Sequence, residues 1–364
     1  MSRHRISVCV LLVLMCSVLA CGGSAPTAIP SSSDAGVHLL LVVEGEVLLK
    51  RDGWSDFHPT SFGVILYRGD QLQPASDAQA VVLCDNLSAW TVPPGVRSGL
   101  NNGCPQSSEP QLVRGESAIG NTRGSSDPLI PYIISPRATS LLDLTPTLRW
   151  NSVPGAKKYS LRISGTDWQA ESNNTEYVYD GQAPLQSGVD YLLIVEADNG
   201  KSSQDEGAPG LGFSLLSDEE AGHVHAAAAM IEELTLSDKA KGFALAQLYS
   251  GQGLHAEAAE LLEGLADAES PAANVCRALG DLYQQVGLPI LAESNYTNAL
   301  DLAEAIGDIE GTAAAQAGLG EVYAALGNKN EAVRWLTQAQ TGYENLGDSQ
   351  RASQIATQIA ELEK

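Results

Sequence analysis

The sequence is poor in basic and in aromatic residues. Of its 364 residues, 21 are Lys or Arg, 44 are Asp or Glu and only 5% are aromatic, and the formal net charge is −23. Residues 218–364 alone carry a net charge of −16. Because nucleic-acid backbones are themselves negative, a chain with no Lys/Arg-rich stripe is not expected to bind them. The acidity is equally consistent with solubility alone.

The chain also lacks the motifs of common enzymes and metal sites. No G-x-S-x-G or H-E-x-x-H pattern occurs, and no Cys/His cluster has the spacing of metal ligands. His223 and His225 are two residues apart, so on a helix they point to different sides. We therefore expect no catalytic residue, no metal and no cofactor. The alternative is an active site assembled from residues distant in sequence.

The first 20 residues have the pattern of a secretory signal peptide. A basic head at residues 3–5 precedes an apolar run, Ile6–Ala20, that is short for a membrane-spanning helix. The run ends in Val-Leu-Ala before Cys21, which resembles a bacterial lipobox, although Leu19 is larger than the usual occupant. The resemblance implies that Cys21 is acylated and anchors an exported protein to the inner or outer membrane. The alternative is an ordinary signal peptide cut near Ala20.

Residues 21–36 are rich in Ser, Pro, Ala and Gly and are predicted to form a flexible tether. Export also changes the expected state of the cysteines, because thiols outside the cytoplasm tend to oxidise. We predict a disulfide between Cys84 and Cys104, since both lie in one strand- and turn-rich segment. A closed loop of about 20 residues contributes roughly 3 kcal/mol. Cys276 lies in a helical pattern and is expected to pack as a small apolar side chain.

Residues 37–104 show short apolar or alternating runs separated by Gly, Asp and Pro, which predicts β structure. The order of several short motifs resembles the FecR-like domain: Gly45-Glu46-Val47, Trp54, Gly69-Asp70-Gln71-Leu72, Ala78-Gln79-Ala80-Val81-Val82 and Pro94-Gly95. The resemblance implies a small extracytoplasmic β domain linked to signalling across the membrane. Regulators of that family carry a cytoplasmic segment, and none precedes the predicted signal peptide, so we do not expect direct regulation of a cytoplasmic sigma factor.

Residues 105–128 are polar and rich in Gly and Ser, as expected of a linker. Residues 129–216 alternate again, with Trp150 as a candidate core aromatic. Leu185–Tyr191 resembles the tyrosine corner of fibronectin type III domains. The resemblance implies an immunoglobulin-like sandwich, a fold that most often serves as a spacer or a binding surface.

Residues 217–364 shift to Ala, Leu and Glu, and Ser217 and Ser237 are predicted to cap helices. Three segments align with Leu, Tyr, Gly and Ala at matching positions: Leu245–Ala258, Leu279–Ala292 and Leu319–Ala332. Their Tyr residues are 34 and then 40 residues apart, and we place the six extra residues around 307–312. The pattern resembles the tetratricopeptide repeat, whose helix pairs stack into a solenoid, with residues 347–363 as the end helix.

In this repeat family, the first helix of each pair lines a concave protein-binding face. The matching positions in this sequence are Phe243, Gln247, Arg277, Asp281, Gln284, Glu321 and Arg351, with Leu245, Leu279 and Leu319 turned into the core. The resemblance implies a protein or peptide ligand with a hydrophobic side chain near Phe243 and acidic groups near Arg277 or Arg351. The alternative is that these residues are merely solvated and the array is a spacer.

The sequence therefore predicts a multidomain chain, with an all-β N-terminal part followed by an all-α tetratricopeptide-repeat solenoid. We expect a membrane-anchored extracytoplasmic lipoprotein that acts as a protein-binding scaffold or adaptor. The alternatives are an envelope-sensing component that acts through the FecR-like domain and an enzyme with an unrecognised site. The expected segments are 1–20, 21–36, 37–104, 105–128, 129–216 and 217–364.

Overall fold

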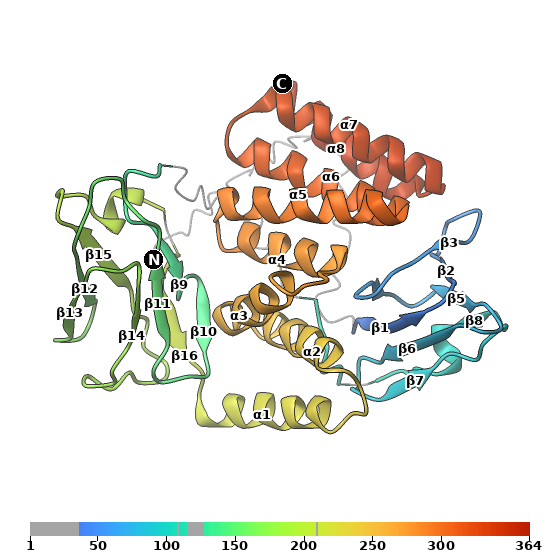
Figure 1. Cartoon of the computed structure of the whole chain (residues 1–364), viewed down its shortest axis with the longest axis horizontal. Coiled ribbons are helices and arrows are strands. Elements are labelled where there is room, and N and C mark those ends of the chain that lie inside the picture. Colours follow the sequence, from blue (N-terminus) through green and yellow to red (C-terminus); the bar gives the residue numbers. More distant parts are fainter. Residues whose placement is uncertain (1–35, 108, 115–126, 209) are drawn as a thin grey trace, which may run out of the picture. The chain divides into compact units, whose positions relative to one another are not determined.

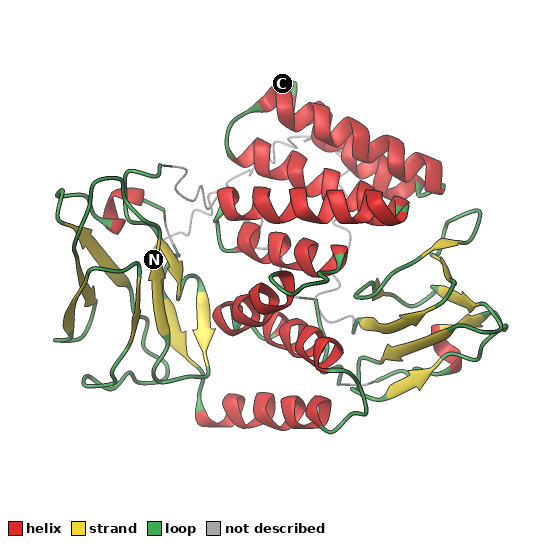
Figure 2. Ribbon diagram, viewed as in Figure 1, coloured by secondary structure: helices red, strands yellow, loops and turns green. Residues whose placement is uncertain are grey.

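The computed structural model describes residues 36–107, 109–114, 127–208 and 210–364. The predicted signal peptide, Cys21 and nearly all of the predicted tether lie outside these residues. The described part contains two strand-rich regions followed by eight helices (Figures 1 and 2), which confirms the predicted order of β and α structure. No helix within the described part has both the length and the apolar character needed to cross a membrane.

The first strand-rich region contains two four-stranded antiparallel sheets, in the orders β4-β1-β6-β7 and β3-β2-β5-β8. The strands are β1 His38–Glu44, β2 Val47–Lys50, β3 His58–Pro59, β4 Ile65–Leu66, β5 Gln71–Pro74, β6 Gln79–Leu83, β7 Ala89–Thr91 and β8 Ser98–Gly99. The region continues past residue 104, because Gly36 pairs with Val113 and the Val37 amide donates to the Leu112 carbonyl at 3.0 Å.

Successive side chains of a strand point to opposite sides, and in β1 the side chains on both sides are buried. Leu40 packs with Leu49 in the core between the two sheets. Leu39 and Leu41 instead join a cluster that contains Phe243 and other helix residues. One strand thus belongs both to the first β region and to the core of the helical array.

The second strand-rich region contains two three-stranded sheets, β14-β11-β9 and β13-β12-β15, and a parallel pair, β10 and β16. In its core, Trp150 is 2% exposed and meets Tyr159 edge to face. The Tyr191 hydroxyl accepts a hydrogen bond from the Gln186 amide at 2.8 Å, the contact expected of a tyrosine corner. The strands are β9 Ile133–Ser135, β10 Thr139–Leu141, β11 Thr147–Trp150, β12 Tyr159–Ile163, β13 Gln169–Ser172, β14 Glu176–Val178, β15 Leu193–Ala197 and β16 Phe213–Leu215.

The helices begin where the sequence predicts caps. The Ser217 hydroxyl accepts from the Glu220 amide, and the Glu220 carboxylate accepts from the Ser217 amide, so each satisfies a free donor at the start of α1. The Ser237 hydroxyl caps α2 by accepting from the Ala240 amide, without the reciprocal bond. The helices are α1 Asp218–Glu232, α2 Asp238–Gly251, α3 His255–Ala266, α4 Ala273–Gln285, α5 Pro289–Ile306, α6 Ile309–Ala325, α7 Lys329–Leu346 and α8 Ser349–Leu362.

Helix pairs approach closely where glycine faces a large side chain. A Cβ atom at Gly280 or Gly318 would lie 2.9 or 2.4 Å from the Tyr296 ring, so only glycine leaves room for it. The six extra residues lengthen helices and do not form a loop at 307–312. Helices α5 and α6 have 18 and 17 residues against 12 and 13 in α3 and α4, and only Gly307 and Asp308 lie between α5 and α6.

Candidate functional site

The predicted binding residues lie on alternate helices, which together form a surface that we call the groove face. Phe243 and Gln247 belong to α2, Arg277, Asp281 and Gln284 to α4, Glu321 to α6 and Arg351 to α8. Leu245, Leu279 and Leu319 are buried in the core, as predicted. In the structure, residues 51–63 of the first β region contact this face.

An ion-pair cluster joins residues 51–63 of the first β region to the helices. The Glu310 carboxylate at the start of α6 accepts from Arg51 Nε at 2.5 Å and from Arg351 Nη1 at 2.8 Å. Arg51 also donates to Asp70 of its own β region at 2.7 Å. The side chains of Arg51 and Glu310 are only 9% and 13% exposed. Because removing one partner would leave a buried charge unpaired, this cluster fixes the position of the segment.

Aromatic and polar contacts extend the interface along the segment. The Trp54 indole donates to Asp348 Oδ2 at 3.2 Å, and Ser61 donates to Asp308 Oδ2 at 3.0 Å. The Asn274 amide donates to the Phe62 carbonyl at 3.0 Å. The Phe62 ring lies 5.5 Å from the Phe243 ring, centroid to centroid. The segment is therefore held by ionic, hydrogen-bonded and aromatic contacts.

The expectation that Phe243 is an exposed apolar anchor is wrong, because Phe243 is fully buried and packs against Phe62. The acidic group expected near Arg351 is Glu310 of the same chain. Arg277 pairs with Asp281 at 2.8 Å on its own helix, and its side chain is 19% exposed.

Gln284 and Glu321 also have hydrogen-bond partners within the chain, whereas the Gln247 side chain makes no hydrogen bond within its described part. The Gln284 amide donates to Glu321 at 3.1 Å, and Gln358 on α8 donates to the other oxygen of that carboxylate at 3.3 Å. Gln247 is half-buried on α2. The groove face is thus largely engaged by this chain's own residues.

Sequence reasoning missed most of the contacting residues. Arg51, Ser61, Asn274 and Glu310 carry no motif, and their partners across the interface are 212 to 259 residues away in sequence. Within residues 51–63 only Trp54 was singled out, for its place in a family pattern, while Phe243 and Arg351 were named as binding residues for an external ligand. Tertiary contacts at such separations leave no periodic signal in one sequence.

The charge cluster shifts the ionisation of its acids in opposite directions. Burial raises the pKa of the Glu310 carboxyl, but Arg51 and Arg351 outweigh burial, and its pKa lies below the ordinary value. For Asp70, burial outweighs the single guanidinium of Arg51, and its pKa lies above the ordinary value. Of these two acids, Glu310 is the one whose carboxylate form is favoured by its surroundings.

The second β region is bonded to the helices by a separate set of contacts. Arg137 pairs with Glu206 at 2.6 Å, with both side chains fully buried, and donates to the Val286 carbonyl at 2.6 Å, just after α4. Arg149 pairs with Glu263 of α3 at 2.7 Å. A guanidinium at the C-terminal end of a helix satisfies carbonyls that the helix leaves unpaired.

These residues surround a cavity too small for a substrate. The cavity holds about 20 Å³ and is lined by Arg137, Arg149, His255, Glu263 and Tyr283, among others. That volume suits a single water molecule. The titratable side chains around it are paired with one another: the Tyr283 hydroxyl, for example, donates to Glu263. The cluster has the character of a packed interface and offers no room for catalysis.

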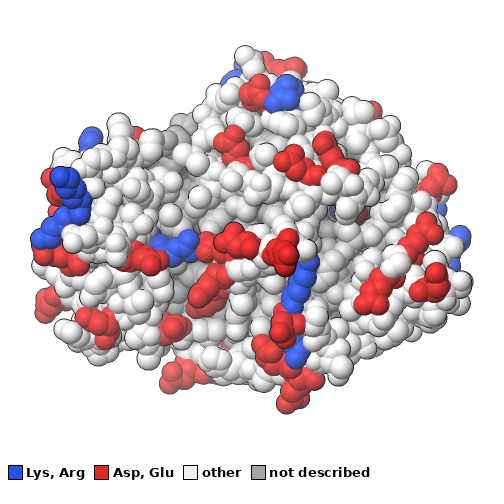
Figure 3. All heavy atoms as spheres, in the orientation of Figure 1, with Lys and Arg blue, Asp and Glu red and all other residues white. Residues whose placement is uncertain are grey.

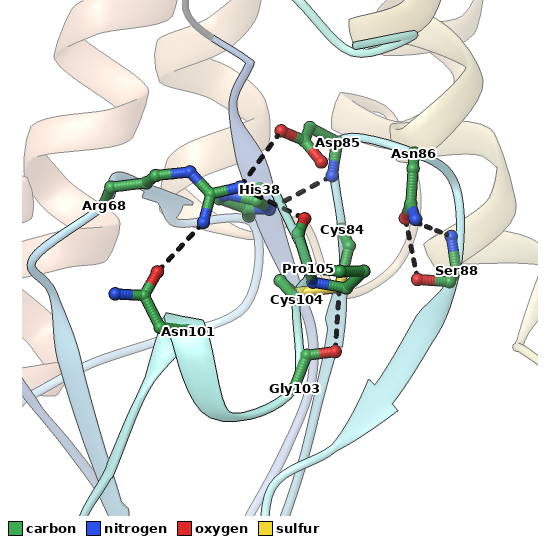
Figure 4. Close-up of a disulfide and its surroundings, with 10 residues drawn as sticks. All are labelled: His38, Arg68, Cys84, Asp85, Asn86, Ser88, Asn101, Gly103, Cys104 and Pro105. Carbon is green, nitrogen blue, oxygen red and sulfur yellow. Dashed lines mark hydrogen bonds and ion pairs between the residues drawn. A yellow bond between two sulfur atoms is a disulfide. The ribbon is translucent and has the colours of Figure 1, made fainter. Parts of the chain in front are cut away.

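Cys84 and Cys104 form a disulfide in the first β region (Figure 4), with Cα atoms 5.3 Å apart, while Cys276 is free and buried. His38 lies beside the disulfide. One of its ring nitrogens and the two sulfur atoms all lie within 4.8 Å of one another. The Asp85 amide donates to His38 Nδ1 at 3.1 Å, and burial lowers the pKa of His38. Nδ1 is thus engaged as an acceptor, and the two sulfur atoms are already bonded to each other. We assign this cluster to the disulfide.

A hollow lies between α5, α6 and α7, and we call it the α5–α7 hollow. It has a volume of about 380 Å³ and is lined by Glu304, Gly307, Ile309, Thr312, Gln316, Gln338, Thr341, Gly342 and Asn345. None of these residues is among those that contact the 51–63 segment.

Acidic side chains outnumber basic ones on the face of the molecule drawn in Figure 3.

Residues 271–345 match the family model of the tetratricopeptide repeat, which confirms the predicted repeats in that part of the chain. The first predicted copy, Leu245–Ala258, lies outside the matched residues. No curated protein matches the chain.

Three solved structures resemble parts of this chain. BtubC from P. vanneervenii is 19% identical over 40% of this chain and 72% of its own, with a TM-score of 0.28. MamA is 18% identical over 41% and 96%, with a TM-score of 0.29. YrrB, described as a tetratricopeptide-repeat protein with an unusual peptide-binding site, is 16% identical over 40% and 80%, with a TM-score of 0.25. At these TM-scores we draw nothing further from them.

Proposed function

We propose that the protein is an exported, lipid-anchored scaffold that binds a partner protein through its C-terminal helical repeats. The repeat match at residues 271–345 supports this role, because such arrays expose extended surfaces suited to protein contacts. The signal-peptide pattern and Cys21 support export and anchoring. In this proposal, residues 37–113 form a FecR-like domain and residues 129–216 a fibronectin-like sandwich.

The observation that carries the proposal is that the array already holds a polypeptide segment. Residues 51–63 meet α2, α4, α6 and α8 through Glu310, Asp348, Asn274 and Phe243. The contacts combine charge-assisted hydrogen bonds with an aromatic pair in which Phe243 is buried and Phe62 half-buried, the chemistry typical of tight interfaces. The repeats thus act as a scaffold for the chain's own β region, and an external partner would use surfaces that this region leaves open.

One contact favours the second candidate, a sensor of the envelope state that acts through the FecR-like domain. Arg51 is bonded at the same time to Asp70 in the β region and to Glu310 on α6. A ligand that moved Asp70 would therefore disturb the array directly. In this alternative, the first β region receives the signal and the repeats transmit it to a separate membrane protein.

Site-specific photo-crosslinking in the native envelope tests the proposal. A benzoylphenylalanine is placed, one position at a time, at exposed apolar residues: Val96 and Val178 in the β regions, and Met230, Ile290 and Ile306 in the helices. We expect a defined protein adduct from at least one helical position and none from Val178. An adduct from Val96 alone would favour the sensor, and no adduct from any helical position would refute the scaffold.

A further inference from the structure

We propose that the α5–α7 hollow binds a basic, extended segment of the partner protein. This inference rests on the proposed scaffold function and names its surface. Residues 51–63 cover part of the predicted groove face, at Phe243 and beside Arg351, whereas the hollow is open. It has a volume of about 380 Å³, and most of its lining residues are exposed, so it is an open surface that an extended segment could reach.

The floor of the hollow depends on small residues. Gly342 of α7 lies so close to α6 that a Cβ atom there would be 2.7 Å from the Ala313 Cβ. The connection between α5 and α6 consists of only Gly307 and Asp308, so this connection forms no loop that could cover the hollow. Long helices that meet through small residues thus leave the space unfilled.

The lining offers free hydrogen-bonding groups. Gln316, Gln338 and Asn345 make no side-chain hydrogen bond within the described part of the chain, and each amide can both donate and accept. The Thr341 hydroxyl donates to the Thr337 carbonyl at 3.0 Å, which leaves its oxygen free to accept. A peptide backbone needs one donor and one acceptor for each residue that it buries. The lining therefore matches an extended main chain.

The charges around the hollow select a basic segment. Glu304 is the charged residue of the lining, and no Lys or Arg lines it. Helices α5 and α7 end beside the hollow, and a helix C-terminus favours a positive charge. Helix α6 starts there, but the Asp308 carboxylate already accepts from the Gly311 amide at 2.8 Å and offsets its positive end.

Apolar side chains at the rim add an anchor. Ile309 lines the hollow and is 41% exposed, and Ile306 at the end of α5 is 61% exposed. Ile309 in the lining, with the exposed Ile306 next to the lining residue Gly307 in sequence, is suited to bury an aliphatic side chain of the bound segment. The occupant that fits is a segment in which Lys or Arg alternates with an aliphatic residue.

The test uses three fluorescein-labelled nine-residue peptides and the full chain. One combines Lys, Ile and Ser, the second has Glu for every Lys, and the third has Ser for every Ile. Fluorescence anisotropy should show that the Lys/Ile peptide binds at least about tenfold more tightly than the other two. Thr341→Trp, which fills the hollow from an exposed position, should reduce its affinity at least about tenfold.

Thr337→Trp is the matched control, because Thr337 is exposed one turn earlier on α7 and does not line the hollow. It should leave binding unchanged. Equal affinity for the wild type and Thr341→Trp would mean only general attraction to an acidic surface, and it would overturn the proposal, as would no binding. Envelope crosslinks from Met230 or Ile290 but not from Ile306 would sustain the scaffold function and reject this surface.

Discussion

Arg51 shows how a single side chain can tie two parts of a chain together. Its guanidinium donates to Asp70 within the β region and to Glu310 on α6, and the planar group lets it engage both acids at once. Arg351 supplies a second positive charge to Glu310. A lone ion pair here would gain little over apolar residues of equal volume. Its structural value lies in fixing the register of residues 51–63 on the helices.

Glu310→Gln should destabilise the chain strongly at neutral pH. The substitution leaves Arg51 buried without its main counter-charge, and breaking a buried pair costs about 3–5 kcal/mol. Glu171→Gln is the control, because its ion pair with Lys158 has side chains 62% and 48% exposed and should be worth at most about 1 kcal/mol. Urea unfolding of both variants at pH 7 gives the comparison. Similar losses for the two would show that the interface does not depend on Glu310.

The ion pair between Arg51 and Glu310 predicts that the free energy of unfolding depends on pH. The pKa of folded Glu310 lies below its ordinary value, so its contribution is complete above about pH 4.3 and is lost as the pH falls through the folded value. The stability difference between the wild type and Glu310→Gln should therefore shrink below about pH 4.3. A difference that stayed constant between pH 7 and pH 3 would contradict the assignment of this charge.

At the scale of elements, features set by neighbours in sequence could be predicted and features set by distant partners could not. The caps at Ser217 and Ser237 and the Tyr191 corner depend on residues at most five positions away. The burial of β1 on both faces depends on α2, about 200 residues further along, and the alternation of its side chains gives no hint of a second partner. The exposure expected of Phe243 failed for the same reason.

The disulfide should be detectable and stabilising. Cys84 and Cys104 close a loop across the first β region, with a sequence separation of 20 residues. Non-reducing peptide mapping of the native protein should recover the linked pair, with Cys276 as a free thiol. The double variant Cys84→Ser, Cys104→Ser should lose about 2–5 kcal/mol. Free thiols at both positions in native protein would disprove the pairing.

At the scale of the molecule, both β regions are bonded to one helical array. Residues 51–63 meet α6 and α8, and Arg137 and Arg149 of the second region meet α3 and the end of α4. The sequence predicted the order of β and α parts and the repeats within residues 271–345. It could not predict these junctions, because docking depends on complementary surfaces and not on local pattern.

Cys21→Ser tests the proposed anchor. If acyl chains on Cys21 hold the protein on a membrane, the variant should move from the membrane fraction to the soluble extracytoplasmic fraction. Mass spectrometry of the wild-type N-terminus should show an acylated cysteine. Continued membrane fractionation of the variant would contradict the anchor, and an unmodified N-terminus near residue 21 would point to an ordinary signal peptide.

The hydrogen bond between Trp54 and Asp348 spans 294 residues, so it has a consequence for the time at which the protein can fold. Synthesis at about 5–20 residues per second separates the two residues by roughly 15–60 seconds. For much of that interval, Leu39, Leu41 and Phe62 have been made, but the helical residues of their cluster, such as Phe243 in α2, have not. Their apolar faces stay open to contacts with other chains until those helices follow. The first β region therefore cannot complete its packing before the helices of this cluster have been made.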